Sequence, residues 1–195
     1  MNRKQTTKLL TDILINDRLS DRKYYAKEVS IDYGTDKVKR VDVMEFVPKG
    51  VLHTSDIEKG HFVCYEIKSC KEDIFSGNGL NFLGEENYIV TTMEIYSKLC
   101  KEGIIADGTI TEFIKEHNPE SSINYGFLVT VPSKITDLRN KTAIIEEFEN
   151  PTKFEGNVGD WRLYKITPCI PTGRDISTIE LLFCMLRSKH SYTNR

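Results

Sequence analysis

Twice in this sequence, a run of residues typical of a buried β-strand passes directly into a run typical of a helix. HFVCYEIK (61–68) is followed by SCKE, and NYIVTT (87–92) is followed by MEIYSKL. Strand residues alternate at a period of two and helix residues at a period near 3.6, so each change of period marks a new element. This alternation predicts an α/β domain in which helices flank a mixed β-sheet.

A capping box, which is a Ser or Thr followed three residues later by Glu, predicts where each of these helices begins. Ser69 and Glu72 form the first pair, and Thr91 and Glu94 form the second. We therefore expect the first helix to begin directly behind Lys68.

Other segments complete the predicted fold. The expected elements are an amphipathic helix over 5–16, a hairpin of YYAKEVSIDYG and KVKRVDVMEFVP, a helix over 108–119, a core strand YGFLVTVP (125–132), strands TAIIEEFENP (142–151) and WRLYKITP (161–168), and a helix opened by Ser177 with Glu180. In the last helix, an apolar stripe is predicted to face the core, formed by Ile179, Leu182, Phe183 and Leu186.

Length and composition favour one globular domain. The chain has 195 residues, enough for one packed core, so we expect a single domain over 1–195 with a core at about 5–132 and an extension of the same domain at 133–195. No run approaches the roughly 20 apolar residues that cross a bilayer, so no membrane contact is expected. The five cysteines contain no C-x-x-C pair, which predicts reduced thiols and a cytoplasmic protein.

The net charge of −2 gives no general support for a nucleic-acid partner, so such a site would have to be a local patch. The charge is unevenly distributed. Residues 1–40 hold ten Lys and Arg against six Asp and Glu, whereas residues 41–173 hold thirteen against twenty-one. The N-terminal segment is therefore a candidate contact surface for an anion.

Three charged residues in predicted strands indicate a functional site. Glu66 and Lys68 lie two apart in the strand 61–68, so their side chains share one face while Ile67 faces the other. Asp42, in the preceding strand, is on a face that also carries apolar groups. If Asp42 faces the same space, two carboxylates meet beside one lysine, as in sites that hold Mg²⁺ or Mn²⁺ and act on phosphodiesters.

This arrangement resembles the D…E-x-K signature of the PD-(D/E)XK, or restriction-endonuclease-like, nuclease superfamily. The order of elements is also similar: an opening helix, a hairpin carrying Asp42, a strand ending in E-x-K, a helix and a further strand. Within that superfamily, residues 20–132 look most like the MmcB-type DNA repair proteins, and 133–195 match only loosely.

The resemblance implies a restriction-endonuclease-like core and a metal-dependent nuclease that hydrolyses DNA, in repair or mobile-element biology. By position, Asp42 and Glu66 would bind the metal together with the backbone carbonyl of Ile67, and Lys68 would be the catalytic lysine. Sequence candidates for a further acid are Glu28, Asp12 and Asp73, and candidates for phosphate contacts are Lys39, Arg40 and Lys71. The glycine-bearing segment SGNGLNFLGEEN is interpreted as a mobile loop over the site.

Other interpretations stay open. A nuclease fold that has lost its chemistry and binds nucleic acid or a protein is favoured by the near-neutral charge and by Val41, which replaces the superfamily's proline before Asp42. Glu66 and Lys68 also suit an ordinary ion pair on a solvated strand. Asp73 suits a first-turn acid favoured by the helix dipole. Finally, the D…E-x-K pattern could arise by coincidence in an unrelated α/β protein.

Overall fold

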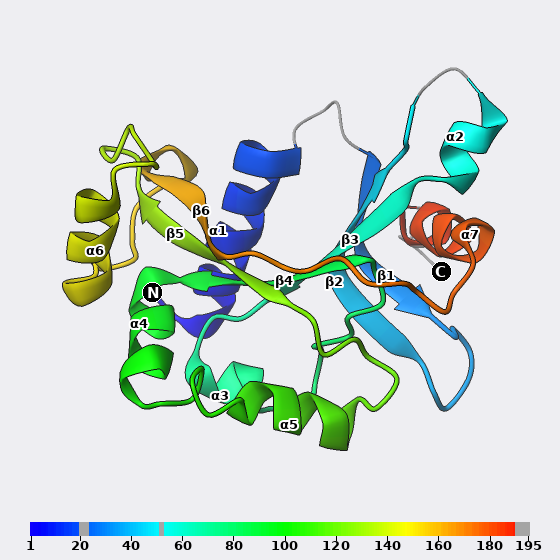
Figure 1. The fold of residues 1–195 in the computed structure, drawn as a ribbon, viewed down its shortest axis with the longest axis horizontal. Coiled ribbons are helices and arrows are strands. Elements are labelled where there is room, and N and C mark those ends of the chain that lie inside the picture. Colours follow the sequence, from blue (N-terminus) through cyan, green and yellow to red (C-terminus); the bar gives the residue numbers. More distant parts are fainter. Residues whose placement is uncertain (20–23, 51–52, 190–195) are drawn as a thin grey trace.

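Six strands form one mixed sheet at the centre of the molecule (Figure 1). The computed structural model describes residues 1–19, 24–50 and 53–189. The strands lie side by side in sequence order, as β1 (Tyr24–Ile31), β2 (Lys39–Val47), β3 (His61–Ile67), β4 (Glu86–Thr92), β5 (Gly126–Pro132) and β6 (Trp161–Thr167). The predicted mixed sheet flanked by helices is therefore confirmed, in a single α/β domain.

The direction of the strands divides the sheet into a meander and a parallel centre. β1, β2 and β3 are successively antiparallel, β3, β4 and β5 are parallel, and β6 returns antiparallel to β5. The parallel pairs need crossover connections, which the segments between β3 and β5 supply. The carboxyl end of β3, where E-x-K lies, therefore opens toward the crossover that begins with α3.

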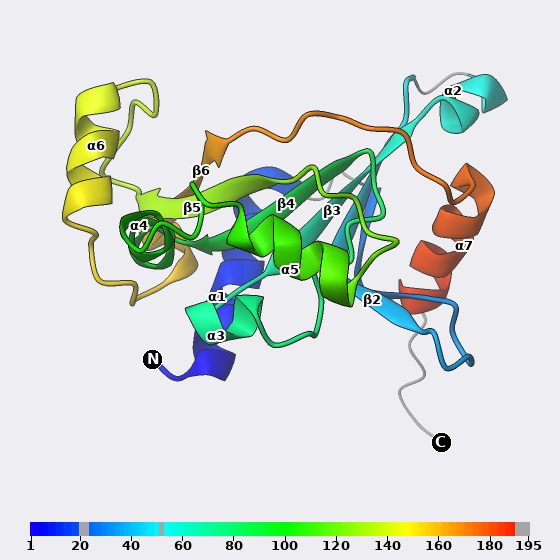
Figure 2. The same cartoon turned by 60° about the horizontal axis from the view of Figure 1, so that its bottom comes forward.

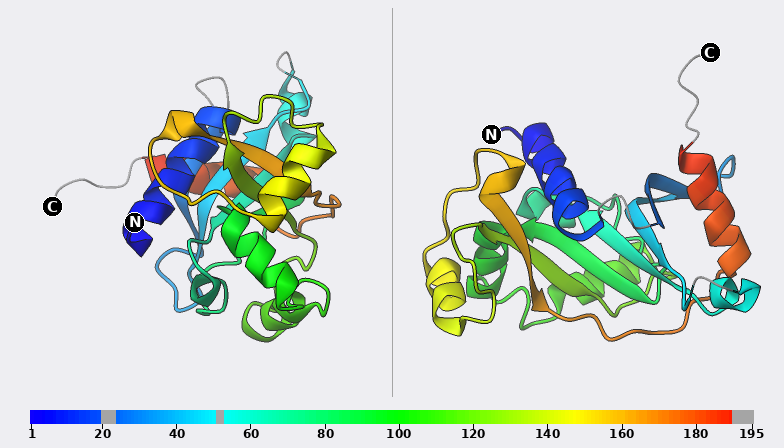
Figure 3. Two further views of the ribbon diagram at one scale, coloured as in Figure 1. Left: turned by 90° about the vertical axis from the view of Figure 1, so that its left-hand side faces the viewer. Right: turned by 90° about the horizontal axis from the view of Figure 1, so that it is seen from above.

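Helices cover both faces of this sheet and one end of it (Figures 2 and 3). They are α1 (Arg3–Leu14) with a π-helical turn η1 (Ile15–Leu19), α2 (Thr54–Glu58), α3 (Lys71–Ile74), α4 (Met93–Lys101), α5 (Thr109–His117), α6 (Lys141–Glu149), a 3₁₀ turn η2 (Val158–Asp160) and α7 (Thr178–Lys189). None of the helices in the described part of the chain is long and apolar enough to cross a membrane.

Alternate residues of the central strands point to opposite faces. Tyr88 and Val90 of β4 pack in the cluster that contains α1, whereas Ile89 packs in the cluster that contains α4 and α5. A third cluster joins the first three strands to α7. Because both faces are covered, β4 and β5 are buried almost throughout their length, as is typical of central parallel strands.

Several predicted boundaries and faces were wrong. The segment 142–151 forms α6 and not a strand, because Asn140 accepts hydrogen bonds from the N–H groups of Thr142 and Ala143 at 3.1 and 3.3 Å and starts a helix. The short α2 was not predicted. In α7 three residues of the predicted stripe, Ile179, Phe183 and Leu186, are exposed, and only Leu182 is partly buried against the first strands. The buried side chains are instead Leu181, Cys184 and Met185.

The two predicted capping boxes were also displaced. Cys70 is the N-cap residue of α3, and Ser69 donates its N–H and its hydroxyl to Asp73 Oδ2 at 3.2 Å. Thr92 caps α4 by accepting a hydrogen bond from the Ile95 N–H. Thr91 instead donates its hydroxyl to the carbonyl of Lys68 at 2.7 Å, so it holds the end of β3 in place.

Candidate functional site

Glu66 near the end of β3 and Lys68 directly after this strand point to the same side of the sheet, as their spacing of two residues predicts. Both side chains are buried. Glu66 is 0% exposed and Lys68 is 3% exposed. Their charged groups form a loose ion pair, with 3.9 Å between Lys68 Nζ and Glu66 Oε2. Burial on this scale argues against the interpretation as a solvated surface pair, because charges are removed from water only at a large free-energy cost.

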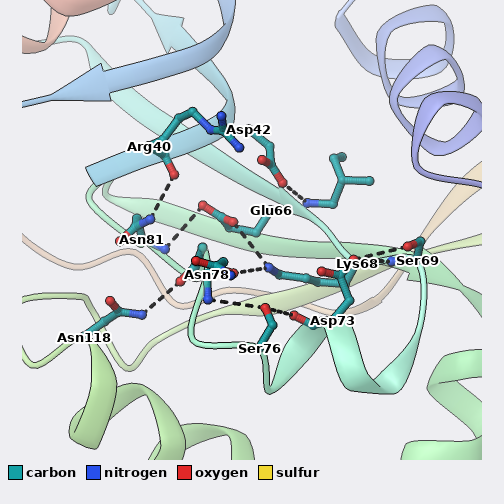
Figure 4. A network of polar contacts seen from close by, with 12 residues as sticks. Arg40, Asp42, Glu66, Lys68, Ser69, Asp73, Ser76, Asn78, Asn81 and Asn118 are labelled. Carbon is teal, nitrogen blue, oxygen red and sulfur yellow. Dashed lines mark hydrogen bonds and ion pairs between the residues drawn. The ribbon is translucent and has the colours of Figure 1, made fainter. Parts of the chain in front are cut away.

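Asp42 reaches the same space from β2 (Figure 4). Its Oδ2 accepts a hydrogen bond from the Ile67 N–H at 2.8 Å, just beyond the last paired residues of β2 and β3. Burial raises the pKa of Asp42, and this effect outweighs the Ile67 hydrogen bond and the positive charges of Lys68 and Arg40, which lower it. Two carboxylates from neighbouring strands therefore meet beside one lysine.

Glu66 is the most perturbed acid of this group. Burial, with a further contribution from the negative charge of Asp42, raises its pKa to about 8. Its Oε1 accepts a hydrogen bond from the Asn81 N–H at 3.3 Å, but among the described residues its buried Oε2 has no hydrogen-bond donor. Buried carboxylate oxygens normally accept at least one hydrogen bond, and Glu66 Oε2 has only the loose ion pair with Lys68.

A loop between α3 and β4 lies over the Glu66 and Lys68 side chains (Figure 4). Lys68 Nζ donates to the Asn78 carbonyl at 2.8 Å. At Gly79, whose φ is +83°, a Cβ atom would lie 2.4 Å from Glu66 Oε2 and 2.7 Å from Lys68 Nζ, so any other residue would strain the backbone and displace these charged groups. Asn81 Nδ2 donates to the Arg40 carbonyl and Asn118 Nδ2 to the Gly79 carbonyl, each at 2.9 Å. The predicted loop therefore does lie over the site.

An open pocket of about 730 Å³ lies beside the loop. Asp42, Ile67 and Lys68 line it, whereas Glu66 lies beneath its surface. Its rim is rich in charged and amide side chains: Arg3, Glu28, Lys39, Arg40, Asp73, Asn78, Asn81 and Asn118. The predicted residues Glu28, Lys39, Arg40 and Asp73 are thus brought to one pocket.

Each of these rim charges has an intramolecular partner. Arg40 and Glu28 form an ion pair at 2.9 Å, and Lys39 pairs with Glu120. Asp73 pairs with Arg3 from the start of α1 and accepts the hydrogen bonds from Ser69. Asp73 therefore has a structural role at the start of α3, although its charge also contributes to the raised pKa of Asp42.

Glu28 has an unusual backbone for a residue in a strand, with φ at +52°. It stands opposite Asp42, between the paired residues Lys27 with Val43 and Val29 with Val41. The regular alternation of faces breaks at this point, since Val41 packs in the cluster with α7 and Val43 in the cluster with α1. Regular alternation in the segment KVKRVDVMEFVP predicts Val41 and Val43 on one face of the strand, and this prediction is wrong because the strand is irregular at Asp42.

Two predicted residues lie away from the pocket. Asp12 is on α1 and is not among the residues that line it. Lys71 is in α3 and pairs with Glu102 at 2.5 Å on another part of the surface. Conversely, sequence reasoning missed Arg3, Asn78, Asn81 and Asn118, because neither the position of α1 nor the path of the loop is encoded in a local pattern.

Among the described residues, no group of three or more His, Cys, Asp or Glu side chains is arranged to hold a metal ion. The five cysteines are all free thiols. Asp42 and Glu66 thus offer two carboxylates to a metal ion, and not a site in which three or more such side chains surround it.

Comparisons of the chain with models of protein families, with curated proteins and with solved structures found no match. Its function must therefore be argued from the site itself.

Proposed function

We propose that this protein is a metal-dependent nuclease of the PD-(D/E)XK type that hydrolyses phosphodiester bonds in DNA. The observation that carries the proposal is the buried Glu66 carboxylate, whose Oε2 has no hydrogen-bond donor among the described residues and which lies beside Asp42 and Lys68. The two acids repel each other when both are ionised, and the loose ion pair with Lys68 offsets this only in part, since the pKa of Glu66 stays raised. A bound cation would offset it further.

The topology of the sheet supports a restriction-endonuclease-like core. β1, β2 and β3 form an antiparallel meander, and β4 adds parallel to β3 after α3. Asp42 comes from the second strand of this meander and Glu66 with Lys68 from the third, in the order that the superfamily signature requires. Asp42 and Glu66 are distant in the chain, yet their side chains meet because β2 and β3 are direct neighbours in the sheet.

The residues present fit a hard divalent cation such as Mg²⁺ or Mn²⁺. Mg²⁺ is commonly held by one or two protein carboxylates, with waters and substrate phosphate completing its shell, so a cage of three or more acids is not required. Asp42 and Glu66 would supply the carboxylates and Ile67 a backbone carbonyl. A bound ion of this kind would polarise the phosphodiester and lower the pKa of an attacking water.

The protein's own residues would orient the substrate around this centre. Lys68 is held by the Asn78 carbonyl and through its own backbone, which Thr91 and Val90 fix from β4. Its ammonium group is positioned to stabilise negative charge that develops on the phosphate during hydrolysis. Arg3 and Arg40, at the pocket rim, are suited to contact neighbouring phosphates, as arginine is in many nucleic-acid sites.

A second candidate function is a nuclease-fold module that binds nucleic acid or a protein without cutting. The position of the loop favours it, because Glu66 and Lys68 are buried and Gly79 fills the space directly above them. For hydrolysis, the loop would have to move away from the two side chains, whereas binding at the pocket rim needs no such movement.

The experiment that tests the proposal compares three proteins: wild type, Glu66→Gln and Glu72→Gln. Glu72 is a matched control because it lies on α3, close to the site in sequence but exposed. The melting temperature is measured with and without millimolar Mg²⁺ or Mn²⁺, and the same samples are assayed for cutting of plasmid and single-stranded DNA.

A metal-dependent shift and cutting that are both lost in Glu66→Gln and kept in Glu72→Gln would support the nuclease. A shift without cutting on either DNA would favour the binding module. No shift in wild type would contradict the metal site.

A further inference from the structure

The outer face of α7 is apolar and exposed. Ile179, Phe183 and Leu186 are 79%, 60% and 59% exposed, and their spacing of four and three residues places them on one stripe of the helix. The opposite side of α7 packs on the first strands of the sheet, so the helix is held in place and does not need this stripe for its own folding. α7 lies at one end of the molecule, and no helix or strand among the described residues covers its outer side (Figure 3).

The surface around the stripe is apolar as well. Of the eleven large hydrophobic residues that are exposed in the described chain, seven lie on α7 or on β1, α2 and the β1–β2 turn: Tyr24, Tyr33, Val38, Ile57, Ile179, Phe183 and Leu186. Val38 is the one of these that lines the pocket beside Asp42. An apolar pocket of about 450 Å³ continues the stripe, with Leu182 and Leu186 on one side and Tyr24 and Ile57 on the other. Exposed apolar surface that is gathered in this way marks an interaction site.

Charges beside the stripe indicate what covers it. Glu180 and Arg187 are seven residues apart, close to two full turns, and so lie on the same flank of α7. Arg187 donates to the Ser30 carbonyl and lies over the rings of Tyr33 and Phe183, at 5.0 and 5.9 Å from their centroids. Its guanidinium is therefore fixed at the edge of the stripe, while Glu180 is exposed at the other end of the helix.

This flank is complementary to itself. If two copies of α7 pack antiparallel about a two-fold axis near Phe183, Glu180 of each copy faces Arg187 of the other. An isologous interface requires such self-complementarity, because the same patch is used on both subunits. In a parallel two-fold pair, the flanks of the two copies would instead lie on opposite sides of the interface, so Glu180 would not meet Arg187 of the other copy.

We propose that the α7 face is the interface of a homodimer, in which two copies of this chain pack their α7 helices antiparallel. The apolar stripe is the centre of the interface, and the two Glu180 to Arg187 pairs lie at its ends. The pocket beside Leu186 extends the contact beyond the two helices and increases the area that each copy buries. The inference is independent of the proposed nuclease function.

The first test measures mass in solution by sedimentation and light scattering over a range of protein concentrations. Wild type should rise from the monomer mass of 22.4 kDa toward twice that value. Ile179→Glu and Phe183→Glu should stay monomeric. Ile145→Glu is the control, since Ile145 is 59% exposed on α6 at the opposite end of the molecule, and it should dimerise like wild type. Circular dichroism of each variant checks that it is folded.

The second test concerns the orientation of the helices. Glu180→Arg should weaken the dimer about three- to tenfold, because it places like charges together in two symmetric exposed pairs. In a parallel pair the two flanks would lie on opposite sides of the interface, so this reversal would leave the affinity unchanged. Arg187→Glu added to Glu180→Arg should restore much of the lost affinity.

Wild type that stays monomeric at all concentrations would overturn the proposal and leave the face for a different protein. A dimer that persists in both Ile179→Glu and Phe183→Glu would show that the copies meet elsewhere. Loss of the dimer in Ile145→Glu as well would also contradict the assignment to α7.

Discussion

Asp42 and Ile67 are joined across β2 and β3 by a hydrogen bond of 2.8 Å from the Ile67 N–H to Asp42 Oδ2. The Asp42 carboxylate thus replaces a strand partner where the pairing of β2 with β3 ends. The same bond fixes its negative charge beside Glu66, so one side chain has both a structural role and an electrostatic one. Variants of Asp42 and Glu66 can separate the structural role from the electrostatic one.

The raised pKa of Glu66 predicts that the protein loses stability as pH rises. Between its ordinary pKa of 4.5 and its folded value of about 8, the folded protein holds a proton that the unfolded chain has lost. The free energy of unfolding should therefore fall by up to about 1.4 kcal/mol per pH unit across this window. Urea unfolding without metal from about pH 5 to about pH 9 measures this slope.

Two variants check the origin of that slope. Glu66→Gln carries no titrating proton, so the contribution of this site to the slope should vanish. Asp42→Asn keeps an oxygen that can accept from Ile67 but removes the neighbouring charge, so the pKa of Glu66 should fall and the window should end at lower pH. An unchanged slope in Glu66→Gln would show that another group causes it.

Lys68→Met is predicted to remove cutting while metal binding remains. The variant keeps a side chain of similar length but loses the ammonium group that is aimed at the site, and loss of one such group typically lowers kcat by about 10²- to 10³-fold. Asp42 and Glu66 are unchanged, so the metal-dependent shift in melting temperature should persist. Single-turnover DNA cleavage and thermal melting measure the two effects.

Lys71→Met is the matched control, since Lys71 is a nearby lysine that pairs with Glu102 away from the pocket. It should cut like wild type. If Lys68→Met also cuts at the wild-type rate, Lys68 has no role in the reaction.

The sequence allowed the sheet and the centre of the site to be predicted, but not their surroundings. The shared face of Glu66 and Lys68 follows from alternation at a period of two, and the central strands β4 and β5 follow from short runs typical of buried strands; both are local properties. Segment 142–151 was misassigned because Ile144 and Ile145 suit either element, and the Asn140 cap decides for a helix. The buried side of α7 could not be predicted because apolar residues occur on both of its faces.

The rim of the pocket depends on long-range placement. Arg3 reaches Asp73 only because α1 packs across the sheet, and Asn118 reaches Gly79 only because α5 lies beside the loop. No spacing within one element predicts such contacts. Glu28 was identified as a candidate acid, but its left-handed backbone was not, since it depends on the distortion of β1 opposite Asp42.

Gly79→Ala is predicted to destabilise the protein more than the same change at Gly34. Both glycines have left-handed backbones, with φ of +83° and +86°, so alanine is strained at either position by about 1 kcal/mol. At Gly34 a Cβ atom meets nothing within 4 Å, whereas at Gly79 it would meet the charged atoms of Glu66 and Lys68. The difference between the two variants in urea unfolding isolates the contact with the site.

We expect Gly79→Ala to be at least about 1 kcal/mol less stable than Gly34→Ala, in the range of overpacked sites. Equal stabilities would mean that the loop moves aside without cost. That result would itself favour a loop that opens readily over the proposed catalytic residues.

Glu28→Gly is predicted to be more stable than Glu28→Ala, although glycine normally weakens a strand. At φ of +52° the backbone of Glu28 is strained for any residue with a Cβ atom, and glycine relieves this strain by about 1 kcal/mol. Both variants lose the ion pair with Arg40, which is exposed and contributes little, so their difference reports the backbone alone. Chemical denaturation of the two variants measures it. A more stable Glu28→Ala would show that β1 returns to regular strand geometry once the Glu28 side chain is removed, and that this side chain, through Arg40, holds the distortion opposite Asp42.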